Sequence, residues 1–129
     1  MRRTDPTCVF CRIVAGEAPA TIVREWPDAL AIVPLNPVVP GHLLVLPRVH
    51  VTDFVDDPAV SGLTAQRAAE LARDMGLSAA NEMTSKGAAA TQTVWHLHRH
   101  LVPRAAGDGL PLPWTPQQEA ARAAQGGLR

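Results

Sequence analysis

The chain has 129 residues, of which 47% are apolar, and its 12 basic side chains balance 12 acidic ones, so the formal net charge is zero. This length fits one domain with a buried core, and the neutral charge excludes a basic field that would hold nucleic acid or anionic lipid at long range. No stretch reaches the roughly 20 apolar residues of a membrane helix, and the start of the chain lacks the apolar core of a secretory signal. We therefore expect a cytoplasmic protein without a membrane or nucleic-acid partner.

Three strands are predicted in the first half of the chain, at residues 21–25, 29–33 and 42–47. The dipeptide Pro27-Asp28 forms a turn between the first two, which predicts a hairpin. The third strand is nearly all apolar, as expected for a central strand buried on both faces. Before them, residues 1–7 are polar and expected to fray, and residues 8–14 form a short apolar segment.

One main helix is predicted between Asp56 and Gly76, where apolar residues recur at helical spacing. Residues 80–85 and 92–102 are predicted to form two further strands, the second stopped by Pro103. The order of strands, one helix and strands indicates an α+β fold with a mainly antiparallel sheet.

A short helix is also predicted near the C-terminus. Residues 115–118 read Thr-Pro-Gln-Gln, a capping box with proline at the first helical position. The helix is expected to end near Ala124.

Three of the five histidines alternate on the last predicted strand: His96, His98 and His100. Alternate residues of a strand share one face, so the imidazoles are expected in a row, ~6–7 Å apart by the rise of a strand. Such a row serves either a zinc site with a third ligand or covalent catalysis, in which one imidazole attacks and its neighbours bind an anion. The alternative is a histidine-rich surface strand that neither binds a metal nor takes part in catalysis. The small, polar segment 87–93 favours phosphate, because its N–H groups allow close approach of an anion.

The two cysteines, Cys8 and Cys11, form a C-x-x-C pair. A redox pair, two unligated cysteines and a zinc site are all compatible with this spacing. A zinc site needs two more ligands, and since the chain has no further cysteine, histidines must supply them.

Three blocks of sequence resemble the histidine triad (HIT) family of nucleotide hydrolases and transferases. Residues 92–104, QTVWHLHRHLVPR, resemble the family signature, and residues 8–19 resemble its N-terminal segment. Residues 35–42 and 47–50 resemble the third block. The blocks occur in family order, which identifies residues 8–104 as a HIT domain.

The resemblance implies a five-stranded antiparallel sheet with one main helix, usually assembled as a homodimer. Residues 105–129 are then a C-terminal tail with a short helix. The implied substrate is a small nucleotide, either a nucleoside phosphoramidate or a dinucleoside polyphosphate.

The resemblance also implies roles at the site. His98 would attack the α-phosphate and form a nucleotidyl-histidine. Water would then hydrolyse this intermediate, or the nucleotide would be transferred to another acceptor. His100 and the backbone of Thr93 and Val94 would hold phosphate oxygens, and Gln92 would orient the leaving group or the water. A neutral imidazole is a competent nucleophile near neutral pH, and flanking donors stabilise the charge on the phosphoryl oxygens.

Family members with this C-x-x-C resemble Cys₂His₂ zinc proteins, and the matching ligands here are Cys8, Cys11, His50 and His96. This zinc would be structural, because it ties the N-terminal segment to the catalytic histidines. The residues that match family positions around the base are Phe10, Ile13, Ile32 and Leu35, for which simple core packing is the alternative.

Four positions depart from the family pattern. Pro34 stands where many relatives carry an aspartate for the ribose, and Ser85 where many carry an asparagine. Thr91 replaces a common glycine beside Gln92, and Arg99 replaces an apolar residue. Arg99 is expected to face away from the histidines and to extend to solvent or find an acid, because an unpaired buried guanidinium is unfavourable.

Two other functions stay open at this point. One is a zinc-stabilised nucleotide-binding or interaction module with little turnover, which the changes at Pro34 and Ser85 favour. The other is a metalloenzyme with zinc on His96, His98 and His100.

Overall fold

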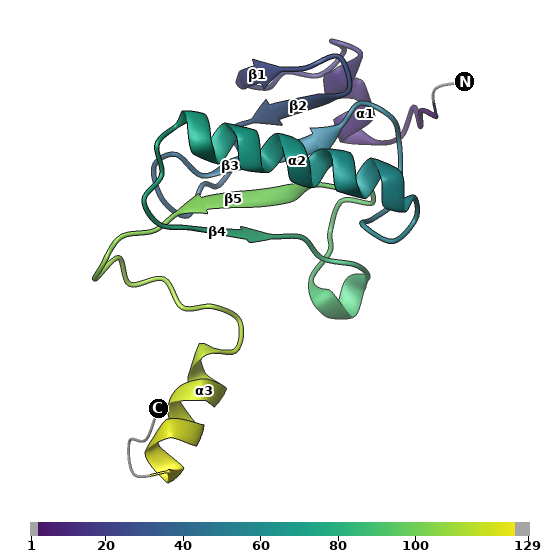
Figure 1. Ribbon diagram of the computed structural model, residues 1–129. Helices are drawn as coiled ribbons and strands as arrows, with labels where there is room; N and C mark the ends of the chain where they lie inside the picture. The colour runs from purple at the N-terminus through teal and green to yellow at the C-terminus, as the bar shows by residue number, and fades with distance from the viewer. Residues whose placement is uncertain (1–2, 126–129) are drawn as a thin grey trace.

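The computed structural model describes residues 3–125. Its centre is a five-stranded antiparallel sheet in the order β1-β2-β3-β5-β4 (Figure 1). The strands are β1 Ile22–Glu25, β2 Ala29–Ile32, β3 Leu43–Pro47, β4 Ala80–Met83 and β5 Arg99–Pro103. The α+β class, the antiparallel sheet and the β1–β2 hairpin are therefore confirmed.

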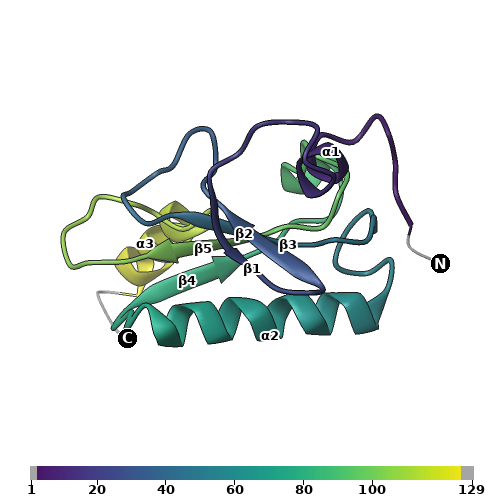
Figure 2. The ribbon, with the colours of Figure 1, turned by 90° about the horizontal axis from the view of Figure 1, so that it is seen from above.

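Each face of the sheet is covered by a different helix, as Figure 2 shows. The long helix α2, Pro58–Asp74, packs on one face with Leu71 against Val45 and Leu101. The short helix α1, Val9–Val14, packs on the other face, where Phe10 and Ile13 belong to a second apolar cluster. All five residues of β3 are buried, as expected for a central strand between two cores.

Helix α2 begins where the sequence predicts. The side chain of Asp57 caps it by accepting hydrogen bonds from the N–H groups of Ala59 (3.1 Å) and Val60 (3.4 Å), and Pro58 occupies the first turn. The helix ends beside Gly76, whose φ of 66° lies in the left-handed region that favours glycine. Within residues 3–125, no helix is long and apolar enough to span a membrane.

The predicted strand over residues 92–102 is wrong in its first half. Only Arg99–Pro103 forms β5, and residues 92–98 form an irregular segment. The difference comes from a tertiary contact, because the Leu97 N–H donates to the carbonyl of Val51 (2.8 Å) instead of to a neighbouring strand. His96 and His98 therefore precede the strand, and only His100 lies on it.

The C-terminal helix α3, Thr115–Ala124, is present, but its predicted capping box is not. The helix begins at Thr115, one residue early, and its N-cap Trp114 makes no side-chain cap. The Thr115 hydroxyl instead accepts from the N–H of Leu112 (2.8 Å). Helix α3 projects away from the sheet on the β4 side (Figure 1).

Candidate functional site

The histidines gather on the α1 side of the sheet, at the start of β5. The ring of His98 packs edge-on against Phe10 of α1, with 5.2 Å between ring centroids. On its other side, the ring of His100 lies 5.4 Å away, closer than an extended strand would place it. The two imidazoles thus form a continuous surface between α1 and β5.

His98 has one defined tautomer. Its Nδ1 lies 2.8 Å from the backbone carbonyl oxygen of His96. Because a carbonyl only accepts, Nδ1 carries the proton and Nε2 keeps its lone pair. Burial lowers the pKa of His98, which favours the neutral ring. In addition, the hydroxyl of Thr84 donates to the His98 carbonyl (2.8 Å) and fixes its backbone. The result is a half-buried, neutral imidazole whose Nε2 has no hydrogen-bond partner among residues 3–125.

His42 extends this arrangement. The N–H of Val38 donates to His42 Nδ1 (3.1 Å), so the His42 proton sits on Nε2. His42 Nε2 in turn donates to His100 Nδ1 (3.0 Å). Burial lowers the pKa of both rings, that of His100 to about 4, so both are neutral near pH 7. The Nε2 of His100 must then carry a proton and is a hydrogen-bond donor.

The segment before the histidines is a tight loop held by Gln92. The buried amide of Gln92 accepts from the N–H of Gly87 (2.8 Å) and donates to the carbonyls of Thr52 (2.7 Å) and Val94 (3.1 Å). Gln92 therefore stabilises the conformation of the loop. Its contact with a leaving group or water stays a prediction. Thr91 has a φ of 70°, which lies in the left-handed region that glycine adopts most easily.

The loop also leaves donors free. Over residues 3–125, the backbone N–H groups of Thr93 and Val94 make no hydrogen bond within the chain. Unpaired backbone donors beside a neutral imidazole are suited to an anion. Ser85, at the base of the same loop, is half-buried.

The Cys₂His₂ cluster is brought together as expected. The ligand atoms of Cys8, Cys11, His50 and His96 all lie within 4.8 Å of one another. The Nδ1 of His96 lies 3.4 Å from Cys8 Sγ and 3.6 Å from Cys11 Sγ, and the Nδ1 of His50 lies 3.4 Å from Cys11 Sγ. A tetrahedral zinc ion with ordinary bond lengths separates its nitrogen and sulfur ligands by about 3.5 Å.

Protonation states in this cluster also fit zinc. His96 Nε2 donates to the carbonyl of Pro47 (2.8 Å), so its Nδ1 lone pair points to the cysteines. Burial lowers the pKa of His96 to about 4 and raises the pKa of Cys11 to about 11. A neutral imidazole is ready to ligate, and a bound cation stabilises the thiolate that burial disfavours. The four residues therefore form a structural zinc site. Since His96 belongs to it, the described residues do not support zinc on the three alternating histidines.

The expected base-binding residues divide into two groups. Phe10, Ile13 and Ile32 are buried together in the core beneath α1. Leu35, by contrast, is 98% exposed in the loop before β3, and the structure does not bring it to the other three. Core packing is thus part of the role of the first three, and Phe10 also contacts His98.

Arg99 faces away from the histidines and finds an acid, as expected. Its guanidinium, 12% exposed, donates to Glu82 (2.9 Å) at the edge of the sheet. It also donates to the hydroxyls of Ser61 (2.9 Å) and Thr64 (3.1 Å) on α2. The departure from an apolar residue is therefore accommodated on the opposite face of the sheet.

The fold and this pair of histidine clusters define the class, and comparison with known proteins gives the same result. Residues 15–107 match the HIT domain, so the chain belongs to the HIT family. It is 42% identical over 124 residues to an uncharacterized HIT-like protein of Mycobacterium tuberculosis, an alignment covering 88% of this chain and 86% of that one. It is 33% identical over 116 residues to the adenosine 5′-monophosphoramidase of Saccharomyces cerevisiae, covering 88% and 73%.

A solved structure supports the metal assignment. The fold matches a Zn-bound histidine triad family protein from Mycobacterium smegmatis with a TM-score of 0.71 and 38% identity. The match covers 92% of this chain and 94% of that one.

Proposed function

We propose that this protein is a nucleotidyl hydrolase or transferase of the HIT type. It cleaves a nucleoside phosphoramidate or a dinucleoside polyphosphate through a covalent intermediate on His98. The observation that carries the proposal is the 2.8 Å contact between His98 Nδ1 and the His96 carbonyl, which leaves a neutral Nε2 nucleophile. The likeness to a monophosphoramidase supports the phosphoramidate class.

In the first half-reaction, the lone pair of His98 Nε2 forms a bond to the α-phosphorus. The bond from phosphorus to the leaving group breaks, and its electron pair goes to the leaving atom, which takes up a proton and departs. For a phosphoramidate this product is an amine. The Nε2–H of His100 and the N–H groups of Thr93 and Val94 donate to the phosphoryl oxygens, where the charge is spread.

In the second half-reaction, water attacks the same phosphorus and the bond to His98 Nε2 breaks. The lone pair returns to His98, a proton is released, and the nucleoside monophosphate leaves. Another acceptor in place of water makes the protein a transferase. Gln92 and Ser85 are proposed to orient the leaving group or the water from the loop and its base.

Zinc, held by Cys8, Cys11, His50 and His96, has a structural role in this proposal. It fixes the His96 ring, and the carbonyl of the same residue fixes the His98 tautomer. His42 is a positioning residue, since it acts on the substrate only through His100.

The nucleoside is proposed to lie on the α1 side of His98, with Phe10 beside it and Ile13 and Ile32 beneath. Leu35 would join them only if its loop closed over the base. Pro34 supplies no acceptor for the ribose, so recognition rests more on the phosphate. We also propose that residues 8–104 form the catalytic domain and that the protein is a cytoplasmic homodimer. Analytical ultracentrifugation tests the dimer.

The test is to trap the intermediate. The protein is mixed with adenosine 5′-phosphoramidate, quenched within milliseconds and measured by intact mass. One adenylyl group should be found on His98, stable in base and labile in acid. The His98→Gln variant should form no adduct, and its kcat should fall by at least about 10³-fold. Gln118→Ala, on the projecting helix α3, is the matched control. Full turnover by His98→Gln would refute the mechanism.

A nucleotide-binding module with little turnover is the second candidate, and the proline at position 34 and the exposed Leu35 favour it. Single-turnover assays with adenylated and guanylated substrates separate the two. Binding without adduct formation on any of them would identify the module.

A further inference from the structure

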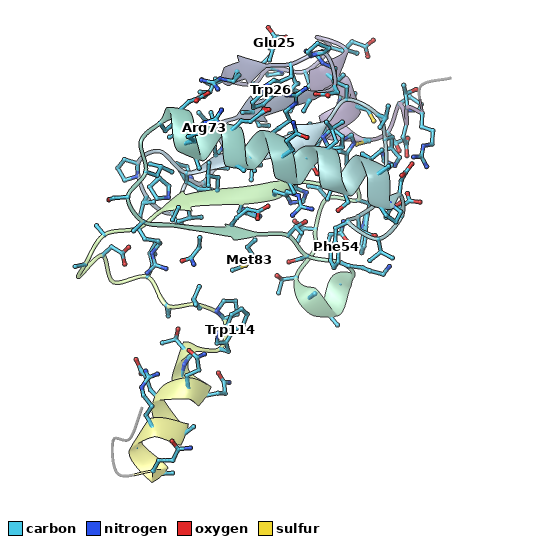
Figure 3. The ribbon with its side chains drawn as sticks, in the orientation of Figure 1. Glu25, Trp26, Phe54, Arg73, Met83 and Trp114 are labelled. Atoms are coloured by element: carbon cyan, nitrogen blue, oxygen red, sulfur yellow. The ribbon has the colours of Figure 1, made fainter. Side chains whose placement is uncertain are left out.

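Thr84, the residue that follows β4, contacts the backbone of the nucleophile. The pairing of β4 with β5 ends at Met83, which lies opposite His100. Directly opposed residues share a face of the sheet, and Figure 3 shows the Met83 side chain pointing away from helix α2. Neither Thr84 nor His98 lies in a strand, yet the Thr84 hydroxyl donates to the His98 carbonyl across 2.8 Å. A side chain thus continues the contact between the two segments where their strand pairing has ended.

This bond acts on the backbone of His98, whereas two other contacts act on its ring. The Nδ1–H bond to the His96 carbonyl (2.8 Å) and the edge-on contact with Phe10, at 5.2 Å between centroids, restrict rotation of the imidazole. The carbonyl carbon of His98 is bonded directly to the Cα that carries the ring. A hydrogen bond to the carbonyl oxygen therefore limits where Nε2 can lie.

The chain after Thr84 leads directly to the loop that is proposed to bind phosphate. The N–H of Gly87 donates to the side-chain oxygen of Gln92 (2.8 Å), which is buried. Gln92 in turn precedes the backbone donors assigned to the phosphate. Residues 84–87 are therefore fixed to His98 at one end and to the loop at the other, so they relate the position of the nucleophile to that of the phosphate donors.

From these contacts we infer that Thr84 is a positioning residue, whose hydroxyl holds His98 Nε2 in line with the α-phosphorus and acts only through His98. The inference rests on the proposed function. A displacement of about 1 Å at a reacting atom lowers a rate by about 100-fold, so the smaller displacement expected from the loss of one hydrogen bond should lower it by about tenfold. Phosphate binding should change little, because its donors belong to His100 and to the loop.

The kinetic test uses single turnover of adenosine 5′-phosphoramidate. Thr84→Val removes the hydroxyl and keeps the shape of the side chain, and the maximal rate of adduct formation should fall by about tenfold. The nucleotide concentration at half-maximal rate should change by less than about twofold, since ground-state binding is untouched. Thr84→Ser keeps the hydroxyl and should restore most of the rate. The matched control is Thr64→Val, which removes a hydroxyl bond of the same 2.8 Å length, to the Ser61 carbonyl on α2, and should keep the rate.

A spectroscopic test reads the hydrogen bond itself. His98-Arg99 is the one His-Arg dipeptide in the sequence, so histidine labelled with carbon-13 at the carbonyl and arginine labelled with nitrogen-15 give a single NMR signal for the His98 carbonyl. In Thr84→Val this carbon signal should move to lower chemical shift, because the carbonyl loses a donor. It should stay close to its original position in Thr84→Ser and in Thr64→Val.

The outcomes separate the two proposals. A moved carbonyl signal with an unchanged rate in Thr84→Val, an unmoved signal, or an equal fall in rate in Thr64→Val each overturns the positioning role and leaves the His98 mechanism intact. Absence of adduct in the unmodified protein with every substrate overturns the proposed function and this inference with it. Circular dichroism checks folding, and the smaller Thr84→Ala provides the reading if Thr84→Val does not fold.

Discussion

His42 Nε2 donates to His100 Nδ1 across 3.0 Å, which links the start of β3 to a residue 58 positions further along the chain. The Val38 N–H sets the His42 tautomer, and His42 sets that of His100. This chain of hydrogen bonds leaves the proton of His100 on Nε2, and the proposed mechanism assigns that proton to a phosphoryl oxygen.

The first prediction concerns His42. His42→Ala should lower kcat/KM for adenosine 5′-phosphoramidate by roughly 10- to 100-fold, because the His100 proton is no longer fixed. His42→Gln should restore most of the loss, since its amide can accept from Val38 and donate to His100. Nitrogen NMR of the imidazoles reports the tautomer directly. Equal activity of the two variants, with the His100 tautomer unchanged in both, would contradict the role of His42.

The second prediction concerns zinc. The protein should bind one zinc ion per chain, and its removal by a chelator should lower Tm by about 10 °C, as expected for loss of a ligand present at 100 times its Kd. Cys8→Ser should show the lower Tm without chelator and no further change with it. If Cys8→Ser kept stoichiometric zinc and an unchanged Tm, Cys8 would not be a required zinc ligand.

Much of this fold follows from local sequence patterns. The apolar run of β3 predicts a central strand, and the Asp57-Pro58 start of α2 predicts a capped helix, because burial and capping depend on neighbouring residues. The zinc ligands also follow, once family resemblance joins the C-x-x-C pair to His50 and His96.

Other features depend on contacts between distant residues, which no local pattern reveals. Residues 92–98 have the alternation of a strand, but the Leu97 N–H bonds to Val51, and this tertiary contact overrides the local preference. The His42–His100 contact likewise needs β3 and β5 to be paired before it can be seen. For Leu35, sequence order matched the family, yet the loop leaves the side chain in solvent.

A third prediction concerns pH and catalysis. Burial places the pKa of His98 below the ordinary value of 6.5, so its ring stays neutral as the pH falls through 6.5. The acid limb of kcat/KM should therefore have its midpoint below 6.5. Steady-state rates between pH 4.5 and pH 8 measure this. An acid limb with a midpoint at or above 6.5 would mean that the site is open to water.

A fourth prediction concerns pH and folding. The pKa of His100 is about 4 in the folded chain and near 6.5 when unfolded, so the unfolded state binds the proton first. Stability is complete above pH 6.5 and falls as the pH drops toward 4, by at most about 1.4 kcal/mol per pH unit for this one group. Urea unfolding at pH 7 and pH 5 should show the loss, and His100→Gln should reduce its slope. An unchanged slope in His100→Gln would assign the effect to other groups.

The last prediction separates the two faces of β5. Arg99 joins the strand to α2 and Glu82 through four hydrogen bonds to Ser61, Thr64 and Glu82, on the face opposite His98 and His100. Arg99→Ala should therefore lower the free energy of unfolding by about 1–3 kcal/mol, because buried acceptors lose a charged donor. Glu82→Gln should change it by less than about 1 kcal/mol, since the Glu82 carboxylate is 40% exposed and the guanidinium keeps its other partners.

Adduct formation should be unaffected in both folded variants, because neither residue touches the nucleotide side. Urea unfolding and intact-mass trapping provide the two measurements. A folded Arg99→Ala protein that forms no adduct would show that the α2 face of β5 controls the position of His98.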